Sequence, residues 1–539
     1  MRALLRVVAL WRPEAPLLLV GALVSLLSVA AAAGLAMAAG RAVVPALLGG
    51  VVLLWALRGL GVGRVVFRYA ERMVTHAATF RALAGLRVWF FRGLARSARG
   101  GLGMLRSGDA LARLVDDVQA LDGVYIRIAI PALATVVLLP LLLWALWPAG
   151  PALALASGAL LLLAAAALPW MAARGAMEAG GQLAEAGAGL RVAALDALTG
   201  MREVRAFGAE GRILASVQAR EASLFGAQRR LARRGAAAQA GATLCAQAAV
   251  LLVLLAPLPA ARLLPALLLT LAAFEAVGAM PRAGVLLGLA ASAARRIVGA
   301  AEAAPSVPEP SAPLPAPSDH GLRFEQVVFA WPGRAPVLDG LSLEVPAGSR
   351  VAILGPSGSG KSTLAALALR VVAPQSGRVK LGGTDLLRLE SAAVHARIAW
   401  LAQGTTLFVD TIRANLLLGR PDANDPELWA ALEQAGVRDV VAALPEGLDT
   451  WLGPGGAGLS GGQGRRIALA RALLSPAPVL ILDEPATGLD AAAERAFLQT
   501  LNDVAPGRTV ILIVHRLLGV ERLDRIWRLS GGRAVAAAG

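Results

Sequence analysis

Six apolar stretches, each long enough to cross a membrane, recur in the first half of the chain, and they constrain its fold more than any other feature. A transmembrane α-helix needs about 20 mostly apolar residues. The stretches cover residues 16–39, 43–67, 126–147, 152–171, 236–258 and 263–289. Lipid offers the backbone no hydrogen-bond partners, so each stretch is expected to be helical. The first is longer than the apolar region of a signal peptide and is expected to remain in the mature protein.

Two long arginine-rich segments separate the second stretch from the third and the fourth from the fifth. They cover residues 68–125 and 173–235, whereas the other links are short. Cytoplasmic loops of membrane proteins carry an excess of Arg and Lys, so both segments and the N-terminus are expected in the cytoplasm. Few prolines interrupt them, which favours helices that continue beyond the membrane and turn back. The same rule accounts for the net charge of +16, and no nucleic-acid motif accompanies it.

A Pro-rich segment divides the chain into two parts of different character. It begins APSVPEPSAPLPAPS and is expected to be a semi-rigid linker over residues 304–319. The residues before it, 1–303, predict an all-α membrane domain of six helices. The residues after it, 320–539, alternate short β-rich runs with helical stretches, which predicts an α/β domain.

The first motif of the α/β domain that indicates a chemical function is a phosphate-binding loop. Residues 355–362 read GPSGSGKS and fit G-x-x-x-x-G-K-[ST], between a β-rich run and a helical run as this loop requires. Its glycines allow backbone N–H groups to surround phosphate oxygens, Lys361 is expected to reach the β- and γ-phosphates, and Ser362 is expected to bind Mg²⁺. The predicted ATP-binding residues here are Gly355, Pro356, Ser357, Gly358, Ser359, Gly360, Lys361, Ser362 and Thr363.

A second element, VLILDE at residues 479–484, is an apolar run that ends in two acids. Asp483 is expected to bind Mg²⁺ and Glu484 to polarise the attacking water, because phosphoryl transfer needs neutralised phosphate charge and a positioned nucleophile. A buried strand that ends in an acidic turn is common. This element therefore indicates ATP hydrolysis only together with the loop upstream.

Between these two elements, LSGGQ at residues 459–463 resembles the signature motif of the ABC transporter ATPases, and the resemblance spans the whole α/β domain. In that family the signature of one ATPase domain completes the nucleotide site of another. The resemblance thus implies a dimer, in which a second domain's nucleotide is contacted by Ser460, Gly461, Gly462 and Gln463.

The same resemblance implies roles for four further residues. They are Gln403 of the Q-loop as a catalytic residue and Mg²⁺ ligand, Asp490 of the D-loop, His515 as the switch histidine that contacts the γ-phosphate, and Trp331 as the aromatic that stacks on adenine. Two departures from the family pattern occur, at Gly464 and Ala486. Neither removes a catalytic group.

The membrane half resembles a narrower family, the CydC-type subunits of bacterial thiol-reductant exporters. The resemblance rests on RYAERMVTHAATFR at residues 68–81, RVWFFR at 87–92, LVDDV at 114–118 and AFEA at 273–276. It implies a heterodimer with a CydD-like half-transporter in the bacterial inner membrane, with the ATPase domain cytoplasmic. It also implies export of glutathione or cysteine and support of cytochrome bd assembly.

CydC-type exporters are associated with a b-type haem, so the resemblance implies haem binding by Arg68, Arg72 and His76. These residues are spaced four apart, which places them along one face of a helix. An imidazole can ligate haem iron, and guanidinium groups can pair with propionates. A solvated basic stripe would show the same spacing, so both interpretations stay open.

Glu275 lies inside the sixth apolar stretch, where an acid is costly and a partner or a pathway is expected. A structural ion pair and a contact with substrate are both open. A general lipid or drug exporter of the same fold is the main alternative function. An importer subunit is disfavoured because the spans precede the ATPase domain in one chain, and a soluble ABC ATPase of DNA repair or translation is disfavoured by the six stretches.

Overall fold

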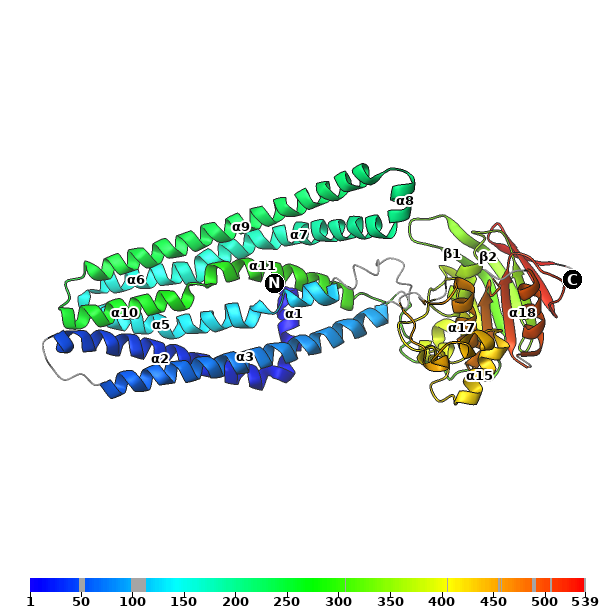
Figure 1. Ribbon diagram of the computed structural model, residues 1–539, viewed down its shortest axis with the longest axis horizontal. Coiled ribbons are helices and arrows are strands. Elements are labelled where there is room, and N and C mark those ends of the chain that lie inside the picture. Colours follow the sequence, from blue (N-terminus) through cyan, green and yellow to red (C-terminus); the bar gives the residue numbers. More distant parts are fainter. Residues whose placement is uncertain are drawn as a thin grey trace. The chain divides into compact units, whose positions relative to one another are not determined.

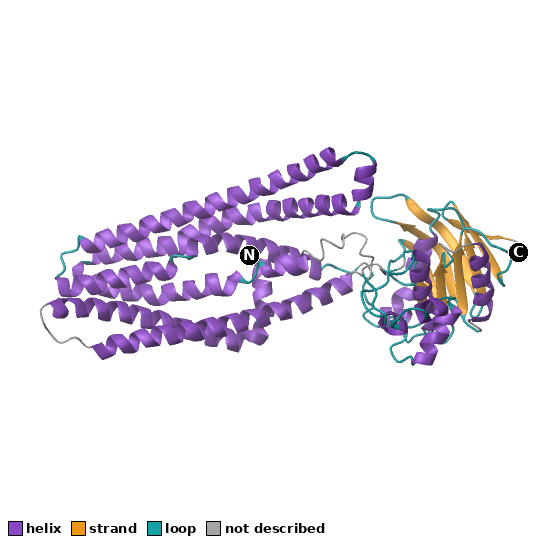
Figure 2. Cartoon of the chain, in the orientation of Figure 1, coloured by secondary structure: helices purple, strands orange, loops and turns teal. Residues whose placement is uncertain are grey.

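The computed structural model describes residues 1–47, 54–97, 113–305, 307–404, 406–453, 456, 458–486, 491–504 and 507–537. The described residues fall into two compact units, those up to Ala303 and those from Ala304 onward. The first unit is built of helices, whereas the second combines strands and helices (Figure 2).

The membrane unit is a bundle of long helices that run alongside one another (Figure 1). They are α1 (Arg2–Leu10), α2 (Ala15–Leu47), α3 (Leu54–Ser97), α5 (Ile130–Leu146), α6 (Pro151–Leu162), α7 (Leu168–Thr199), α8 (Met201–Ala206), α9 (Glu210–Leu254), α10 (Ala260–Val277) and α11 (Met280–Ala301). Short π-helical turns lie at Arg113–Asp117, Tyr125–Ala129 and Leu163–Ala167.

Five helical stretches among the described residues are long and apolar enough to cross a membrane. They are Arg12–Ala46, Tyr125–Ala149, Pro151–Thr199, Glu210–Leu254 and Ala260–Ala301. They contain four of the six predicted stretches entirely, and a fifth, 236–258, up to Leu254. The remaining one, 43–67, lies partly outside the described residues and otherwise mostly on α3, where Arg58 and Arg64 interrupt the apolar run. The helix Pro151–Thr199 has 49 residues. At 1.5 Å per residue it extends about 70 Å, more than twice the roughly 30 Å of a bilayer core.

Glycines bring α11 against α7. A Cβ atom added at Gly284 would overlap the carbonyl oxygen of Pro169, and one added at Gly288 would overlap that of Ala173. Helices in membranes associate through such small residues, because lipid tails are as apolar as the side chains and close backbone packing supplies the attraction instead. Close backbone packing at Gly284 and Gly288 therefore holds α7 and α11 together.

A charged contact anchors the turn Arg113–Asp117 on α11. The guanidinium of Arg296 donates to both carboxylate oxygens of Asp117, at 2.9 and 2.5 Å, and to the hydroxyl of Ser292 at 2.9 Å. Asp117 is buried. A bidentate pair of this kind adds geometric specificity as well as energy.

The ATPase unit contains two sheets. The strands are β1 (Leu322–Ala330), β2 (Pro336–Val345), β3 (Arg350–Leu354), β4 (Ser376–Leu381), β5 (Thr384–Asp385), β6 (Ile398–Leu401), β7 (Val479–Asp483), β8 (Thr509–Val514), β9 (Arg525–Ser530) and β10 (Arg533–Ala537). An antiparallel sheet has the order β2-β1-β4-β5, and a larger sheet has the order β10-β9-β3-β8-β7-β6. The helices are α12 (Lys361–Ala368), α13 (Ser391–His395), α14 (Ile412–Leu417), α15 (Asp425–Gln434), α16 (Arg438–Ala442), α17 (Gly461–Leu474) and α18 (Ala491–Val504).

Four neighbouring strands of the larger sheet, β3, β8, β7 and β6, are parallel. β7 is buried along its whole length, as expected of a strand covered on both faces. Leu354 pairs with Val514, Asp483 with Ile513 and Leu401 with Leu482, so the carboxyl ends of these strands meet at one edge. Ligands of open parallel sheets bind outside this edge.

The Pro-rich segment is docked on the ATPase unit. Val307 is buried. The guanidinium of Arg370, a fully buried side chain just after α12, donates to the Glu309 carboxylate at 2.9 Å and to the carbonyl of Pro308 at 2.6 Å. The N–H of Leu314 donates to the carbonyl of Arg388 at 2.9 Å. Composition alone predicts a spacer, whereas the described part of this segment belongs with the ATPase unit.

Candidate nucleotide-hydrolysis site

The phosphate-binding loop connects β3 to α12 and contains two glycines with left-handed backbone. Gly358 has φ of +81° and Gly360 has φ of +99°. A Cβ atom at Gly360 would lie 2.7 Å from a methyl carbon of Leu338, so a larger residue is excluded by space as well as by conformation. Gly360 caps α12, whose first N–H groups point out of the helix at this loop. Such a helix start binds anions through these N–H groups and its positive end.

Lys361 is the first residue of α12 and is held inside the loop. Its Nζ donates to the carbonyl of Gly355 at 2.8 Å and to that of Pro356 at 3.0 Å. Burial lowers the pKa of this ammonium, while the carboxylates of Glu484 and Asp483 oppose the shift. The charge is therefore placed where the loop would surround phosphate oxygens.

Ser362 and Asp483 meet across the loop, because the hydroxyl donates to Asp483 Oδ2 at 2.9 Å. Asp483 is 1% exposed. Burial raises the pKa of its carboxyl group, an effect that the Ser362 hydrogen bond opposes. Among the described residues, no cluster of three or more His, Cys, Asp or Glu side chains has the geometry to hold a metal ion by itself.

This donor set fits Mg²⁺, which binds nucleotides through one or two protein oxygens, phosphate oxygens and water. Ser362 and Asp483 would hold it, and their hydrogen bond already brings the two oxygens together. When bound, Mg²⁺ neutralises charge on the β- and γ-phosphates. The third predicted ligand, Gln403, instead donates its amide Nε2 to Glu484 Oε2 at 3.0 Å.

Glu484 lies between Gln403 and His515, each of which follows a different parallel strand. Besides the Gln403 contact, His515 Nε2 lies 2.5 Å from Glu484 Oε1. The backbone of Glu484 has φ of +49°, an uncommon value for a residue other than glycine, and its N–H donates to the carbonyl of Ile513 at 2.8 Å. Non-glycine residues in this region concentrate at functional sites, where the surrounding structure holds the strain.

The arrangement can polarise a water molecule for attack on a phosphate. The Glu484 carboxylate is fixed in position by Gln403 and His515 and can accept a hydrogen bond from water. Lys361 and the start of α12 bind the phosphate charge that the attack increases. The predicted catalytic residues Glu484, Gln403 and His515 are thus brought together beside the loop.

The sequence motifs do not include Arg465, which holds three parts of the site together. Its guanidinium donates to the carbonyls of Gln403 at 2.5 Å, Asp483 at 2.8 Å and Glu484 at 2.5 Å. Arg465 lies in the second turn of α17, so it links the signature helix to the ends of β6 and β7. Burial lowers the pKa of Arg465, while Glu484 and Asp483 oppose the shift. The one feature of the sequence that could have indicated this role is the position of Arg465 directly after Gly464, which departs from the family pattern.

The signature segment is ordered within its own helix. Ser460 caps α17: its hydroxyl accepts from the Gln463 N–H at 3.2 Å, and the Ser460 N–H donates to the Gln463 side chain at 2.8 Å. This reciprocal capping box leaves Gly461 and Gly462 at the exposed helix start. Within the described chain, no hydrogen bond joins the signature to the phosphate-binding loop. Asp490 lies outside the described residues.

Trp331 lies beside the phosphate-binding loop. Its Nε1 donates to the hydroxyl of Thr363 at 3.2 Å, and its ring meets Phe329 edge to face at 5.1 Å. The side chain therefore has a defined position next to α12, and its stacking on adenine stays a prediction.

Comparison with known proteins identifies both units. Residues 338–487 match the family described as ABC transporter, and residues 19–258 match the ABC transporter transmembrane region. The Glutathione/L-cysteine transport system ATP-binding/permease protein CydC of Escherichia coli (strain K12) is 33% identical over 99% of this chain and 96% of its own length.

The chain belongs to the ABC transporter family. The protein with the same description from Haemophilus influenzae is 30% identical over 89% of this transporter and 85% of its own length. A solved structure described as a bacterial Atm1-family ABC exporter with ATP bound superimposes with a TM-score of 0.87 at 27% identity, covering 96% of this transporter and 94% of that chain. The predicted half-exporter fold, the resemblance to CydC-type subunits and the ATPase activity are confirmed.

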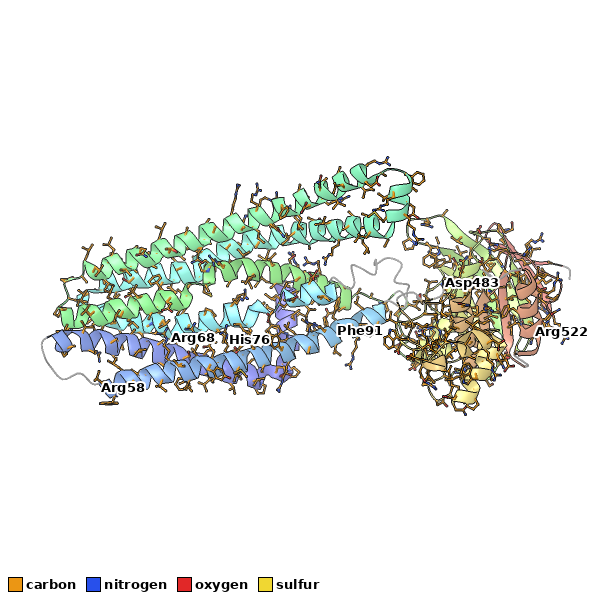
Figure 3. All side chains as sticks on the ribbon, in the orientation of Figure 1. Arg58, Arg68, His76, Phe91, Asp483 and Arg522 are labelled. Atoms are coloured by element: carbon orange, nitrogen blue, oxygen red, sulfur yellow. The ribbon has the colours of Figure 1, made fainter. Side chains whose placement is uncertain are left out.

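The residues expected to bind haem all lie on α3 of this transporter, and Figure 3 labels two of them, Arg68 and His76. Arg68 lines a cavity within the membrane unit, whereas Arg72 and His76 do not line it. Arg72 is exposed, and His76 is half-buried against Phe80, with ring centres 5.9 Å apart. The three residues do not line this cavity together, so the described part of this chain does not support the expected haem site.

Glu275 lies on α10 and faces the same cavity as Arg68. Its carboxylate is 3.7 Å from the guanidinium of Arg64 on α3. The ion pair left open by the sequence is therefore present, and it lines a cavity.

Proposed function

We propose that this transporter is the CydC-like half of a heterodimeric exporter that uses ATP to move glutathione or cysteine across the bacterial inner membrane. The ATPase domain lies on the cytoplasmic side in this proposal. The second half is a CydD-like chain.

The observation that carries the proposal is the extent of the similarity to CydC. That relative aligns over 99% of this chain, membrane unit included. The ATP-dependent lipid A-core flippase of Chromohalobacter salexigens is more similar, at 42% identity, but over only 45% of this chain. A membrane domain contacts the cargo directly, so similarity that includes it bears on substrate more than similarity of part of the chain.

Dimerisation is supported by the site itself, and the choice of a heterodimer by the resemblance to CydC-type subunits. The catalytic residues and the phosphate-binding loop gather in one chain, whereas the signature segment makes no hydrogen bond to that loop among the described residues. A second ATPase domain is needed to bring a signature to this nucleotide, and the resemblance to CydC-type subunits indicates a CydD-like chain.

Uptake into inside-out vesicles tests the proposal. Vesicles that contain this chain with its CydD-like partner are expected to accumulate labelled glutathione or cysteine in an ATP-dependent manner. Vesicles with Glu484→Gln are expected to bind ATP without accumulating either thiol. An active homodimer that transports thiols without a second chain would contradict the heterodimer but not the substrate.

A lipid exporter is the second candidate, favoured by 42–45% identity to lipid A-core flippases over 39–45% of this chain. In that case lipid, and neither thiol, would stimulate ATP hydrolysis by the reconstituted complex. The same vesicles with lipid substrates decide between the candidates.

Two further proposals rest on the resemblance to CydC-type subunits. Loss of the exporter is expected to lower the amount of assembled cytochrome bd in the host. Haem ligation by His76 is the second, with further surroundings of the haem supplied by the partner. Soret absorbance of the purified complex tests it: wild type is expected to absorb and His76→Ala to lose the band, and equal absorbance would remove His76 from the site.

A further inference from the structure

The membrane unit contains an open cavity of about 480 Å³ between α2, α3, α10 and the helical segment that contains α5. Small-molecule sites typically have volumes of about 300–1,000 Å³. Much of the wall consists of alanine side chains, which leave the cavity wide. They are Ala32, Ala33, Ala36, Ala39, Ala134, Ala272 and Ala276.

Four charged residues of both signs line this cavity. Arg64, Arg68 and Glu71 are spaced four and three residues apart on α3, so they lie on one face of that helix. Glu275 lies across from them on α10. Ionisable residues are expensive within a membrane and mark pathways when they line a cavity.

The contact between Arg64 and Glu275 is loose. At 3.7 Å their closest atoms are beyond hydrogen-bond distance. The side chain of Glu275 is 71% exposed, so it remains accessible to a ligand. A tight structural pair would resemble Arg296 and Asp117, which share two short hydrogen bonds. The Arg64 and Glu275 groups are therefore available to bind a third partner.

We propose that this cavity is a binding site for a zwitterionic amino acid or short peptide. Arg64 and Arg68 bind its carboxylates by charge-assisted hydrogen bonds, and Glu275 binds its ammonium group. Glu71 balances the second guanidinium, so the four side chains together carry no net charge. The inference rests on the proposed thiol export and names the groups of the substrate that the site recognises.

The charge pattern disfavours a lipid phosphate. An anionic headgroup is matched by cations alone, and two carboxylates in the same cavity would repel it. A zwitterion instead satisfies both signs. Glutathione, with two carboxylates and one ammonium group, and cysteine, with one of each, both have this chemistry.

Transport kinetics with ligand analogues test the assignment. Glutathione, its N-acetyl derivative without the ammonium charge, and its glycyl monoethyl ester with one carboxylate fewer are compared in inside-out vesicles of the complete complex. Arg64→Gln, Arg68→Gln and Glu275→Gln are each expected to raise the KM for glutathione about tenfold or more, because each removes a charged hydrogen bond. Arg58→Gln, on the same helix but outside the cavity, is the matched control and is expected to retain the wild-type KM.

The analogues distinguish specific recognition from general damage. Wild type is expected to prefer glutathione over the N-acetyl derivative, and Glu275→Gln is expected to lose that preference. In Arg68→Gln the preference over the monoethyl ester is expected to shrink instead. A variant that raises KM equally for all three compounds would overturn the assignment of that residue.

Failure of the site and failure of the proposed function give different results. If wild type transports glutathione and the cavity variants behave like Arg58→Gln, the site is wrong and thiol export stands. If wild type transports no thiol, the proposed function fails. If Arg68→Gln abolishes Soret absorbance without changing glutathione kinetics, Arg68 belongs to a haem site and its assignment here is overturned.

Discussion

The ATPase unit and the membrane unit place their functional charges differently. In the ATPase unit these groups already contact one another: Ser362 donates to Asp483, and Gln403 and His515 hold Glu484. In the membrane unit Arg64 and Glu275 lie 3.7 Å apart at a cavity. Hydrolysis of a bound nucleotide is fastest when the catalytic side chains are already held in position before the reaction. A transport site must instead release its cargo, and loose pairs can exchange partners.

The largest expected effect tests whether the fixed ATPase geometry is catalytic. Glu484→Gln is expected to lower ATP turnover at least about a hundredfold while ATP binding persists, because the carboxylate is lost and the loop remains. Turnover and nucleotide affinity of the purified complex provide the measurement. Lys361→Ala, which removes a phosphate-binding charge, is expected to lose both. Native turnover by Glu484→Gln would contradict the assigned role.

A second prediction concerns Arg465, which acts through other residues. Arg465→Gln is expected to lower kcat about tenfold with a smaller change in KM, because Gln403, Asp483 and Glu484 lose a shared donor. Arg465→Lys should restore little, since an ammonium lacks the planar fork that reaches several carbonyls. The neighbouring Arg466, which donates to the carbonyl of Gly436 at 2.8 Å, provides the matched control. Equal losses of kcat in Arg465→Gln and Arg466→Gln would indicate general destabilisation.

In the membrane unit the corresponding test concerns the close packing of α7 on α11. Gly284→Ala is expected to destabilise the packing of α7 on α11 by about 1–3 kcal/mol, because the added carbon overlaps the Pro169 carbonyl. Gly299→Ala on the same helix meets no atom within 4 Å and is expected to be neutral or stabilising. Thermal unfolding of the detergent-purified transporter compares the two. An equal Tm for both would mean that α7 and α11 tolerate separation.

The smallest effect concerns the pH dependence of stability. Burial raises the pKa of Asp483 in the folded protein, so its ionised form is disfavoured there relative to the unfolded chain. The resulting loss of folding stability is fully present above the pKa of Asp483 in the folded protein. It is absent below the pKa of Asp483 in the unfolded chain, which is near 3.9.

Asp483→Asn is therefore expected to raise the Tm of the nucleotide-free ATPase unit by a few degrees at neutral pH, with a gain that shrinks toward pH 4. Ser362→Ala removes the opposing hydrogen bond and is expected to lower the Tm instead. A gain that is independent of pH would show that ionisation of Asp483 is not its source.

Some features of both units could be predicted because their signals are local. The loop GPSGSGKS, the acids after β7 and His515 after β8 lie next to strands that the sequence itself indicates, and parallel strands end at one edge. Five of the six predicted apolar stretches lie wholly or mostly in helices that meet the length and hydropathy expected of a span. The stretch 43–67 is not among them, because Arg58 and Arg64 interrupt the apolar run on α3 and part of the stretch lies outside the described residues.

Other features required the packed chain. The Pro-rich composition indicated a spacer, but Arg370 holds Glu309 and Pro308 against the ATPase unit. The stripe of Arg68, Arg72 and His76 was expected to act together, yet only Arg68 of the three lines the cavity. A helix face is wider than one pocket, so spacing along α3 does not decide which residues share it.

The sequence by itself determined that this chain is a membrane-embedded ABC transporter with its catalytic residues at the ends of parallel strands. Those signals lie within short segments, where periodicity and motif spacing follow from backbone geometry. Only the tertiary structure decided that Arg465 joins three carbonyls and that Arg64 meets Glu275, more than 200 residues away. Such contacts depend on how helices and strands pack, and one sequence contains no local pattern that records which distant side chains the packing brings together.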